Sequence, residues 1–269
     1  MKTGNDNIPG FQINAGEGFN SKMNSILMKD DETLEELQPG GFKLLQKRKG
    51  FRFGMDSVLL AHFAYIREKD HVVDFGTGSC VLPLLLLSRN KGESFHCIEI
   101  QHEMAEMAER TVMMNKLEPR IKVICGDATK ASTMFDSCSV DCVISNPPYA
   151  IPGSALSSPD QSRAISRNQS NETLEGFFSS AFRILKGKGR FSMVYPAAQM
   201  FQAMTMLKKA HLEPKRFQLV YPYEDKPANL VLIEAVKDAK ASLHPLPPLI
   251  VYNSDHVLTN KLKSVYHMI

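Results

Sequence analysis

The residues with the clearest chemical potential are four in a row, Asn146-Pro147-Pro148-Tyr149, which follow the mainly apolar run at residues 140–144. Proline fixes the backbone angle φ, so a turn with two prolines is stiff. In α/β proteins, ligands bind at the carboxyl ends of the strands. The turn is therefore either structural punctuation or a rigid holder for one amide group, on Asn146, and one aromatic face, on Tyr149.

A second candidate is the glycine-rich sequence VVDFGTG, which contains Asp74, Gly76 and Gly78. Glycine allows a positive φ and lets the backbone pass close to a ligand. The dinucleotide-binding pattern G-x-G-x-x-G requires a third glycine at position 81, where this chain has Val81. This sequence alone is therefore compatible with a ligand-binding turn and with a plain turn between a strand and a helix.

Two further acidic residues come at the ends of the next predicted strands. Glu99 ends the second strand, where a carboxylate can accept hydrogen bonds from both hydroxyls of a ribose. Asp127 ends the third strand and could accept a hydrogen bond from an adenine amino group. Each would alone be read as a surface charge or a helix cap, but the ends of parallel strands converge on one crevice. Together they predict a ligand with adenine and ribose and no pyrophosphate.

The elements that position these residues alternate between strand and helix from residue 71 onward. Strands are predicted at residues 71–78, 94–100, 121–128, 140–149, 190–196, 215–223 and 229–236, and helices at 81–90, 101–117, 173–189 and 197–212. Such alternation predicts an α/β fold with a mainly parallel, seven-stranded sheet and helices on both faces. The last two strands have no helix between them, so we expect the last strand to be antiparallel.

Two boundaries are also predicted. The helix at 173–189 should end at Gly187 or Gly189, because glycine adopts the left-handed cap easily. The preceding residues, 150–172, are polar and are expected to form a long loop, which in compact domains is commonly functional.

Composition and charge narrow the class of protein. The chain has 269 residues, with 43% hydrophobic and 23% charged residues, which is ordinary for a soluble globular protein. A net charge of +3 permits a nucleic-acid partner without requiring one. No apolar run approaches the length of a membrane span, and no Cys/His cluster indicates a metal. Five cysteines without a CxxC pair indicate reduced thiols, so we expect a cytoplasmic protein. We also expect a monomer, although the sequence does not determine the oligomeric state.

The first 70 residues differ in character from the rest. Residues 1–27 are rich in Asn, Gly and Ser and are expected to be a flexible tail. Residues 28–70 are interpreted as an N-terminal cap segment, with a short helix that Asp56 or Ser57 caps. Residues 71–269 then form the main domain.

The four motifs VVDFGTG, CIEI, CGDA and SNPPY, in this order and spacing, resemble the class I S-adenosylmethionine-dependent methyltransferases. The resemblance implies a Rossmann-like fold with S-adenosylmethionine as the cofactor. Within that class, Asn-Pro-Pro-Tyr is typical of enzymes that methylate a nitrogen conjugated to a π system. Examples are adenine N6 in DNA or RNA and the amide of glutamine.

The same resemblance assigns roles to the turn that opened the analysis. The Asn146 side-chain oxygen and the Pro147 carbonyl would accept the two amino hydrogens of the target, Pro148 would keep them rigid, and Tyr149 would stack on the base. Asp74, Gly76, Gly78, Glu99 and Asp127 would bind the cofactor.

The flanking sequences FKLLQKRKGFRFGMDSVLLAHFA and NLVLIEAVKDAKASLHPLPPLIVY are similar to the bacterial tRNA1(Val) (adenine-37-N6)-methyltransferase family. This resemblance covers about residue 30 to the end of the chain. It implies that Phe53, Asp56 and Ser57 lie beside the cofactor and that tRNA is the partner. Nearby basic residues are then expected to meet its phosphates: Lys47, Arg48, Lys49 and Arg52.

The similarity to that family is incomplete in the loop that follows Tyr149. Relatives carry Arg-His-Glu, whereas this chain has Arg167-Asn168-Gln169. Arg167 matches and is expected to bind substrate, whereas Asn168 and Gln169 replace a titratable pair. A second basic group is compatible with phosphate binding and equally with a solvated face: Lys208, Lys209, Lys215 and Arg216.

Two alternatives remain open from the sequence. A protein glutamine N5-methyltransferase acting on release factors shares Asn-Pro-Pro-Tyr, but its relatives carry a separate N-terminal helical domain, and only about 70 residues precede the first strand here. A non-catalytic module that binds S-adenosylmethionine or RNA is disfavoured by the intact Asn146. The hypothesis retained is N6-methylation of an adenine in tRNA near the anticodon.

Overall fold

The structure is a computed structural model that describes residues 27–38, 40–49, 53–147 and 161–266, with the backbone alone described over residues 161–171. The predicted tail at 1–27 lies almost wholly outside the described residues. So do Arg52, Pro148, Tyr149 and the side chain of Arg167.

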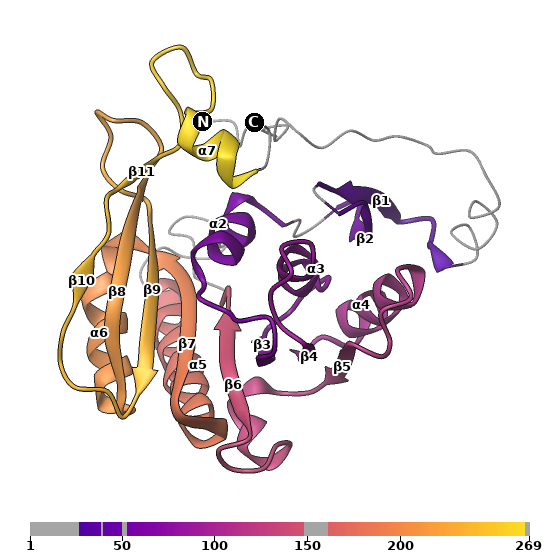
Figure 1. Ribbon diagram of the computed structural model, residues 1–269, viewed down its shortest axis with the longest axis horizontal. Helices are drawn as coiled ribbons and strands as arrows, with labels where there is room; N and C mark the ends of the chain where they lie inside the picture. Colours follow the sequence, from indigo (N-terminus) through magenta and orange to yellow (C-terminus); the bar gives the residue numbers. More distant parts are fainter. Residues whose placement is uncertain (1–26, 39, 50–52, 148–160, 267–269) are drawn as a thin grey trace.

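A nine-stranded sheet runs through the middle of the molecule (Figure 1). Its path is β10-β8-β9-β7-β6-β3-β4-β5, and β11 pairs with β8 off this path. The strands are β3 (His71–Phe75), β4 (Ser94–Glu99), β5 (Ile121–Cys125), β6 (Val140–Ser145), β7 (Leu185–Pro196), β8 (Leu212–Tyr221), β9 (Leu230–Lys237), β10 (His244–Pro245) and β11 (Leu249–Ile250).

Strand directions follow the predicted pattern. Strands β3 to β7 pair in parallel, and β9 is antiparallel to both of its neighbours, β7 and β8. The seven predicted strands are all present. The additional β10 and β11 pair in parallel with β8 and have two residues each. They are short because the prolines at 245, 247 and 248 have no N–H to donate to a ladder.

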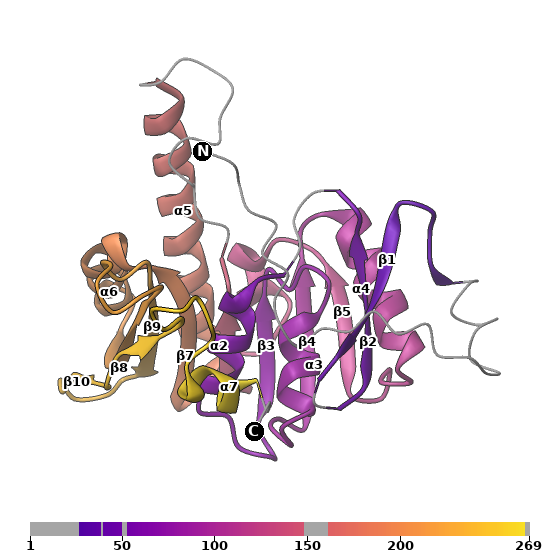
Figure 2. The same ribbon diagram turned by 90° about the horizontal axis from the view of Figure 1, so that it is seen from above.

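Helices cover both faces of the sheet, as Figure 2 shows. One apolar core joins the sheet to α2 (Met55–Phe63), α3 (Val81–Leu87), α4 (His102–Met114) and α7 (Asn260–Val265). A second core on the opposite face joins it to α5 (Gln161–Ile184), α6 (Met200–Lys209) and the 3-10 turn η1 (Ala128–Thr133). Neighbouring strand residues alternate between the cores, since Val72 belongs to the first and Val73 to the second. No helix in the described part of the chain is long and apolar enough to span a bilayer.

Helix α5 differs from the prediction at both ends. It begins at Gln161, within the predicted loop, and it ends at Ile184, before either glycine. The left-handed residue that follows is Lys188, with φ of 64°. The chain changes from helix to strand here because Ile184 and Leu185 are both fully buried and Leu185 pairs with Val140 of β6. The predicted glycine cap is therefore wrong.

Helix α2 also begins differently. Its N-cap residue is Gly54, which is extended and makes no side-chain cap bond, while Asp56 lies in the first turn. The predicted cap by Asp56 or Ser57 is wrong, because the helix starts one residue earlier than the polar pair.

An unpredicted β-hairpin precedes α2. Strands β1 (Glu32–Leu37) and β2 (Phe42–Lys47) form a separate two-stranded sheet that packs on α4. Glu32 is fully buried, and both of its oxygens accept hydrogen bonds from the Arg110 guanidinium of α4, at 2.6 and 2.7 Å. Burial raises the pKa of Glu32, but the bonds from Arg110 and from the backbone N–H of Lys29 outweigh it, so the net pKa is lowered. The hairpin is thus attached to the main domain by a buried ion pair.

We expect Glu32→Gln to lower the free energy of unfolding by about 3–5 kcal/mol, because the largely buried guanidinium would lose its bidentate charge partner and keep only the longer ion pair with Glu106. Urea denaturation would measure the change. The control is Glu106→Gln, since Glu106 also pairs with Arg110 at 3.4 Å but is 36% exposed and should cost under about 1 kcal/mol. Equal effects from the two variants would contradict this account of the hairpin.

Candidate active site

The parallel register brings the predicted site residues to one edge of the sheet. Phe75 of β3 pairs with Ile98 of β4 and with Ser145 of β6, so the residues that follow these three lie side by side. They include Gly76, Glu99 and Asn146. The carboxyl ends of the strands therefore converge as expected for a ligand site in an α/β sheet.

The glycine-rich turn after β3 adopts left-handed backbone angles. Gly76 and Gly78 have φ of 72° and 57°. The N–H groups of Gly76 and Thr77 both donate to the Ile98 carbonyl, at 2.9 and 3.1 Å, which fixes the turn against β4. A Cβ atom added to Gly76 would have no atom within 4 Å, so glycine is needed there for its φ rather than for space. The space beside the Gly76 Cα is therefore open.

Glu99 lies next to this turn and holds it. Its side chain is 5% exposed, and its two oxygens accept hydrogen bonds from the backbone N–H groups of Gly78 and Gln101, both at 2.9 Å. A carboxylate has about four acceptor positions, so two remain for other donors. The carboxylate is oriented by backbone groups and can still accept the two hydroxyls of a ribose.

Asp74 is fully buried beneath the turn. Its Oδ2 accepts a hydrogen bond from the Thr77 hydroxyl at 2.7 Å, whereas Oδ1 is buried with no partner. Burial raises the pKa of Asp74 to about 7, the Thr77 bond opposes this rise, and the charge of Glu99 adds to it. A buried acceptor without a partner is unfavourable, so this edge is suited to a ligand that brings a donor or a positive charge.

Asn146 lies directly after β6 and is half-buried. Its Nδ2 donates to the Ser57 hydroxyl of α2 at 3.3 Å, which leaves the amide oxygen as an acceptor. The preceding Ser145 is anchored by a bond from its hydroxyl to the Phe75 carbonyl at 2.9 Å, and the following Pro147 is buried. The bond to Ser57 therefore orients the amide, and the residues on either side of Asn146 are anchored or buried. Ser57, predicted beside the cofactor, contacts Asn146.

Phe53 and Asp127 are the two remaining residues predicted to bind the cofactor. Phe53 is buried, and its N–H donates to the side-chain oxygen of Gln46 at 2.9 Å. Gln46, on the hairpin, in turn donates to Glu35 at 2.6 Å. Asp127 accepts from the N–H and the hydroxyl of Thr129 through Oδ1, at 2.9 and 2.7 Å, and so caps η1. Its Oδ2 takes no part in these two bonds.

Two of the predicted phosphate-binding residues near β2 already have partners in the protein. Lys47 pairs with Asp31 at 2.8 Å, and Arg48 donates through Nε to the Asp30 carbonyl at 3.0 Å. Lys49 is exposed. Their predicted contact with phosphate stays a prediction.

Arg216, from the second basic group, has a structural role. It bonds both oxygens of Glu234, at 2.8 and 2.9 Å, and its guanidinium lies 4.5 Å from the ring centre of Phe63. Both of these partners are in the protein, so Arg216 is not a candidate phosphate ligand.

The sequence did not indicate two contacts that shape the site: Gln46 to Phe53, and Ser57 to Asn146. Ser57 and Asn146 are 89 positions apart, and although Gln46 and Phe53 are only seven apart, no spacing rule predicts either contact. Among the described residues, no cluster of three or more His, Cys, Asp or Glu side chains could hold a metal ion.

Comparison with known families gives a match over this same region. The family model of the methyltransferase small domain matches residues 54–215, more than half of the 269-residue chain. The matched segment includes α2, the glycine turn, Glu99, Asp127 and Asn146.

Curated relatives match about seven tenths of the chain. A tRNA1(Val) (adenine(37)-N6)-methyltransferase of Tolumonas auensis is 28% identical over 193 residues, which is 71% of this chain and 79% of the relative. A protein of the same name from Bacteroides fragilis (strain YCH46) is 27% identical over 192 residues, 71% of this chain and 80% of the relative.

Solved structures share the fold. A predicted O-methyltransferase of Agrobacterium tumefaciens superposes with a TM-score of 0.63 at 22% identity, over 79% of this chain and 96% of that one. TYW2 of Pyrococcus horikoshii, solved in complex with MeSAdo, superposes with a TM-score of 0.54 at 17% identity, over 78% and 73%. The predicted fold class, a Rossmann-like methyltransferase sheet, is confirmed.

The buried carboxyl of Asp74 predicts a pH-dependent stability. In the unfolded chain it ionises near its ordinary pKa of 3.8, whereas in the fold its pKa is about 7. Between these values the folded state binds more protons, so this group's contribution to stability falls as pH rises from 4 to 7. Asp74→Asn cannot ionise and removes this loss.

We expect Asp74→Asn to gain stability relative to the natural chain as pH rises from 4 to 7, by up to about 4 kcal/mol. Thermal or urea unfolding at several pH values would measure the difference. The exposed Asp136→Asn is the control and should show no such trend. A pH-independent difference for Asp74→Asn would mean that this carboxyl is ionised throughout.

Proposed function

The chain belongs to the methyltransferase small domain family, and on this premise we propose that it transfers the methyl group of S-adenosylmethionine to N6 of an adenine in tRNA. The observation that carries the proposal is the Asn146 amide, held by Ser57 at the sheet edge that also carries Asp74 and Glu99. The curated relatives bear the name of a tRNA adenine-N6 methyltransferase, which supports tRNA as the substrate class. Such a substrate also supports a cytoplasmic location.

The cofactor half of the site fits S-adenosylmethionine. This molecule combines an adenine, a ribose and a cationic amino acid, and when bound it supplies an electrophilic methyl group on a sulfonium. Glu99 retains acceptor positions for the ribose hydroxyls, and Asp127 has an oxygen for the adenine amine. The unpartnered Oδ1 of Asp74 suits a positively charged ligand. The absence of a third glycine at position 81 agrees with a ligand that has no pyrophosphate.

The acceptor half of the site addresses the weak nucleophilicity of adenine N6. Its lone pair is delocalised into the ring, and an in-line transfer requires that lone pair to point at the methyl group. The Asn146 amide oxygen and the Pro147 carbonyl would accept the two amino hydrogens, which favours a pyramidal nitrogen. The bond from Asn146 Nδ2 to Ser57 keeps the amide oxygen in place before the substrate arrives. The proton leaves after transfer, when the nitrogen is cationic, so no general base is needed beforehand.

A methyl-transfer assay tests the function directly. Labelled S-adenosylmethionine is offered to unmodified bulk tRNA and, in parallel, to peptide release factors. Label in N6-methyladenosine after digestion to nucleosides, detected by mass spectrometry, is the expected result. Label in the release factor would instead support glutamine methylation, and label in neither would reject both.

We expect Asn146→Ala to lower kcat for tRNA methylation by about 100-fold or more, because the substrate amine loses a preorganised acceptor. The dissociation constant for S-adenosylmethionine, measured by calorimetry, should stay within about twofold. Asn260→Ala, the same change on the first turn of α7, is the control and should leave both values unchanged. A loss of cofactor affinity in Asn146→Ala would show that Asn146 also takes part in cofactor binding, so its assignment to the acceptor half alone would be wrong.

We expect Glu99→Gln to raise the dissociation constant for S-adenosylmethionine by about 10-fold or more, because hydrogen bonds from the ribose to a charged acceptor are lost. Calorimetry measures this without turnover. The control is Glu103→Gln, in the first turn of α4 and exposed. Unchanged affinity in Glu99→Gln would mean that another residue holds the ribose.

A further inference from the structure

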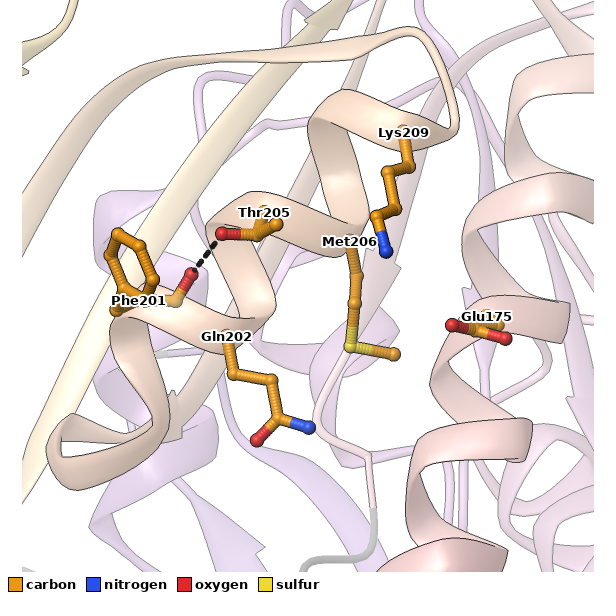
Figure 3. Close-up of a pocket in the computed structure, with 6 residues that line it drawn as sticks. All are labelled: Glu175, Phe201, Gln202, Thr205, Met206 and Lys209. Atoms are coloured by element: carbon orange, nitrogen blue, oxygen red, sulfur yellow. Dashed lines mark hydrogen bonds between the residues drawn. The ribbon is translucent and has the colours of Figure 1, made fainter.

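A groove between α5 and α6 is not used by the mechanism above. It encloses about 340 Å³ and is lined by Glu175 of α5 and by five residues of α6: Phe201, Gln202, Thr205, Met206 and Lys209 (Figure 3). Phe201 is 84% exposed, more than any other large hydrophobic side chain that the structure describes. Its exposed aromatic face is available for a base to stack on.

The start of α6, at one end of the groove, follows the strand that pairs with β6. Strand β7 lies beside β6 in the sheet, and Met193 of β7 pairs with Ser145, the residue before Asn146. Three residues later β7 ends at Pro196, and the turn η2 (Ala197–Gln199) leads directly into α6 at Met200. The first turn of α6, with Phe201, is therefore one strand away from Asn146 on the same edge of the sheet.

The lining combines an apolar floor with polar and charged groups. Gln202, Met206 and Lys209 are spaced by four and three residues, so they lie on one side of α6, and Figure 3 shows Met206 and Lys209 extending toward Glu175. Met206 is buried, whereas Gln202, Lys209 and Glu175 are exposed. Within the described chain, neither Lys209 nor Glu175 takes part in an ion pair. Lys208, next to Lys209, is 61% exposed and meets Glu213 only at 3.9 Å.

These groups match the parts of a nucleic-acid strand. An exposed ring provides a face for base stacking, and lysines at the far end of the helix provide charge for a phosphate. Phe201 and Lys209 are eight positions apart, which corresponds to about 12 Å along a helix and suits a short single-stranded segment. Glu175 would repel a phosphate, but its carboxylate can accept a hydrogen bond from an exocyclic base amine.

We propose that this groove binds a short single-stranded segment of the tRNA that flanks the target adenine. One base stacks on Phe201, a base amine donates to Glu175, and a phosphate lies near Lys208 and Lys209. Because uracil has no exocyclic amine, the groove discriminates against it next to Glu175. The inference rests on the proposed function, since it assigns a further part of the same substrate.

Direct binding tests the proposal without turnover. The dissociation constant of fluorescently labelled, unmodified bulk tRNA is measured by anisotropy for the natural chain and its variants. We expect Phe201→Ala to raise it about 10-fold, Phe201→Tyr to stay near the natural value, and Phe201→Leu to resemble Phe201→Ala, since stacking needs an aromatic face. Met113→Ala, which removes another exposed hydrophobic side chain on α4, is the control and should have no effect.

The charged end of the groove gives an independent readout. Lys209→Ala should reduce the slope of log affinity against log salt by about one, because one phosphate contact is lost. A dissociation constant for tRNA that is the same in Phe201→Ala as in the natural chain would overturn the proposal. An unchanged dissociation constant in Phe201→Leu would also overturn the proposal, because any hydrophobic side chain would then suffice and base stacking would not be required.

The failure of this inference and the failure of the proposed function are distinguishable. Methylation of tRNA by the natural chain decides the function, whereas the ratio of variant to natural binding decides the inference. If the natural chain methylates tRNA and Phe201→Ala binds tRNA as tightly as the natural chain does, the groove is rejected and the function stands. If Phe201→Ala weakens tRNA binding but the natural chain methylates no tRNA, the function is rejected and the groove stands. If the natural chain does not bind tRNA at all, the groove is rejected as well.

Discussion

The parallel pairing of β3 with β4 on one side and with β6 on the other is the constraint on which the site depends. Because Phe75 is in register with both Ile98 and Ser145, the next residues of three strands must emerge together. A slip of one residue in either pairing would turn the strand's side chains to the other face of the sheet. The apolar alternation that fills both cores therefore also fixes where the carboxylates and the amide lie.

Much of the fold was predictable because its signals are local. The alternation of apolar strands with helices, and the missing helix between β8 and β9, were sufficient for the sheet and for its antiparallel strand. The edge positions of Asp74, Glu99 and Asn146 followed from strand ends alone. The functional roles of these residues are still predictions, as are the domain limits.

Other features depended on contacts between distant parts of the chain. The hairpin was missed because its charged residues conceal the alternation of a strand, and its one buried carboxylate is explained only by Arg110, 78 positions away. The end of α5 was misplaced because the glycines at 187 and 189 are good local caps, yet the pairing of Leu185 with Val140 begins the strand earlier. Arg216 looked like a free cation in the sequence and is held by Glu234 in the fold.

The site combines a rigid frame with one unfavourable group. Backbone N–H groups orient Glu99, the Ser57 hydroxyl accepts a hydrogen bond from the Asn146 side chain, and Ser145 is anchored to Phe75, so these groups are positioned before a substrate binds. Asp74, in contrast, keeps an acceptor buried without a partner. Natural proteins commonly accept such a local cost at a functional site, where a ligand supplies the missing interaction.

The position of β9 limits how this chain can be dissected. The family match ends at residue 215, a few residues into β8, but β9 (Leu230–Lys237) lies between β7 and β8 and bonds to both. A truncated fragment made of the matched residues would lack this strand and would expose the long edge of β7. Unpaired edges of that kind promote aggregation. The segment recognised by similarity is therefore smaller than the cooperative folding unit, and a fragment meant for expression or domain exchange needs to extend at least through residue 237.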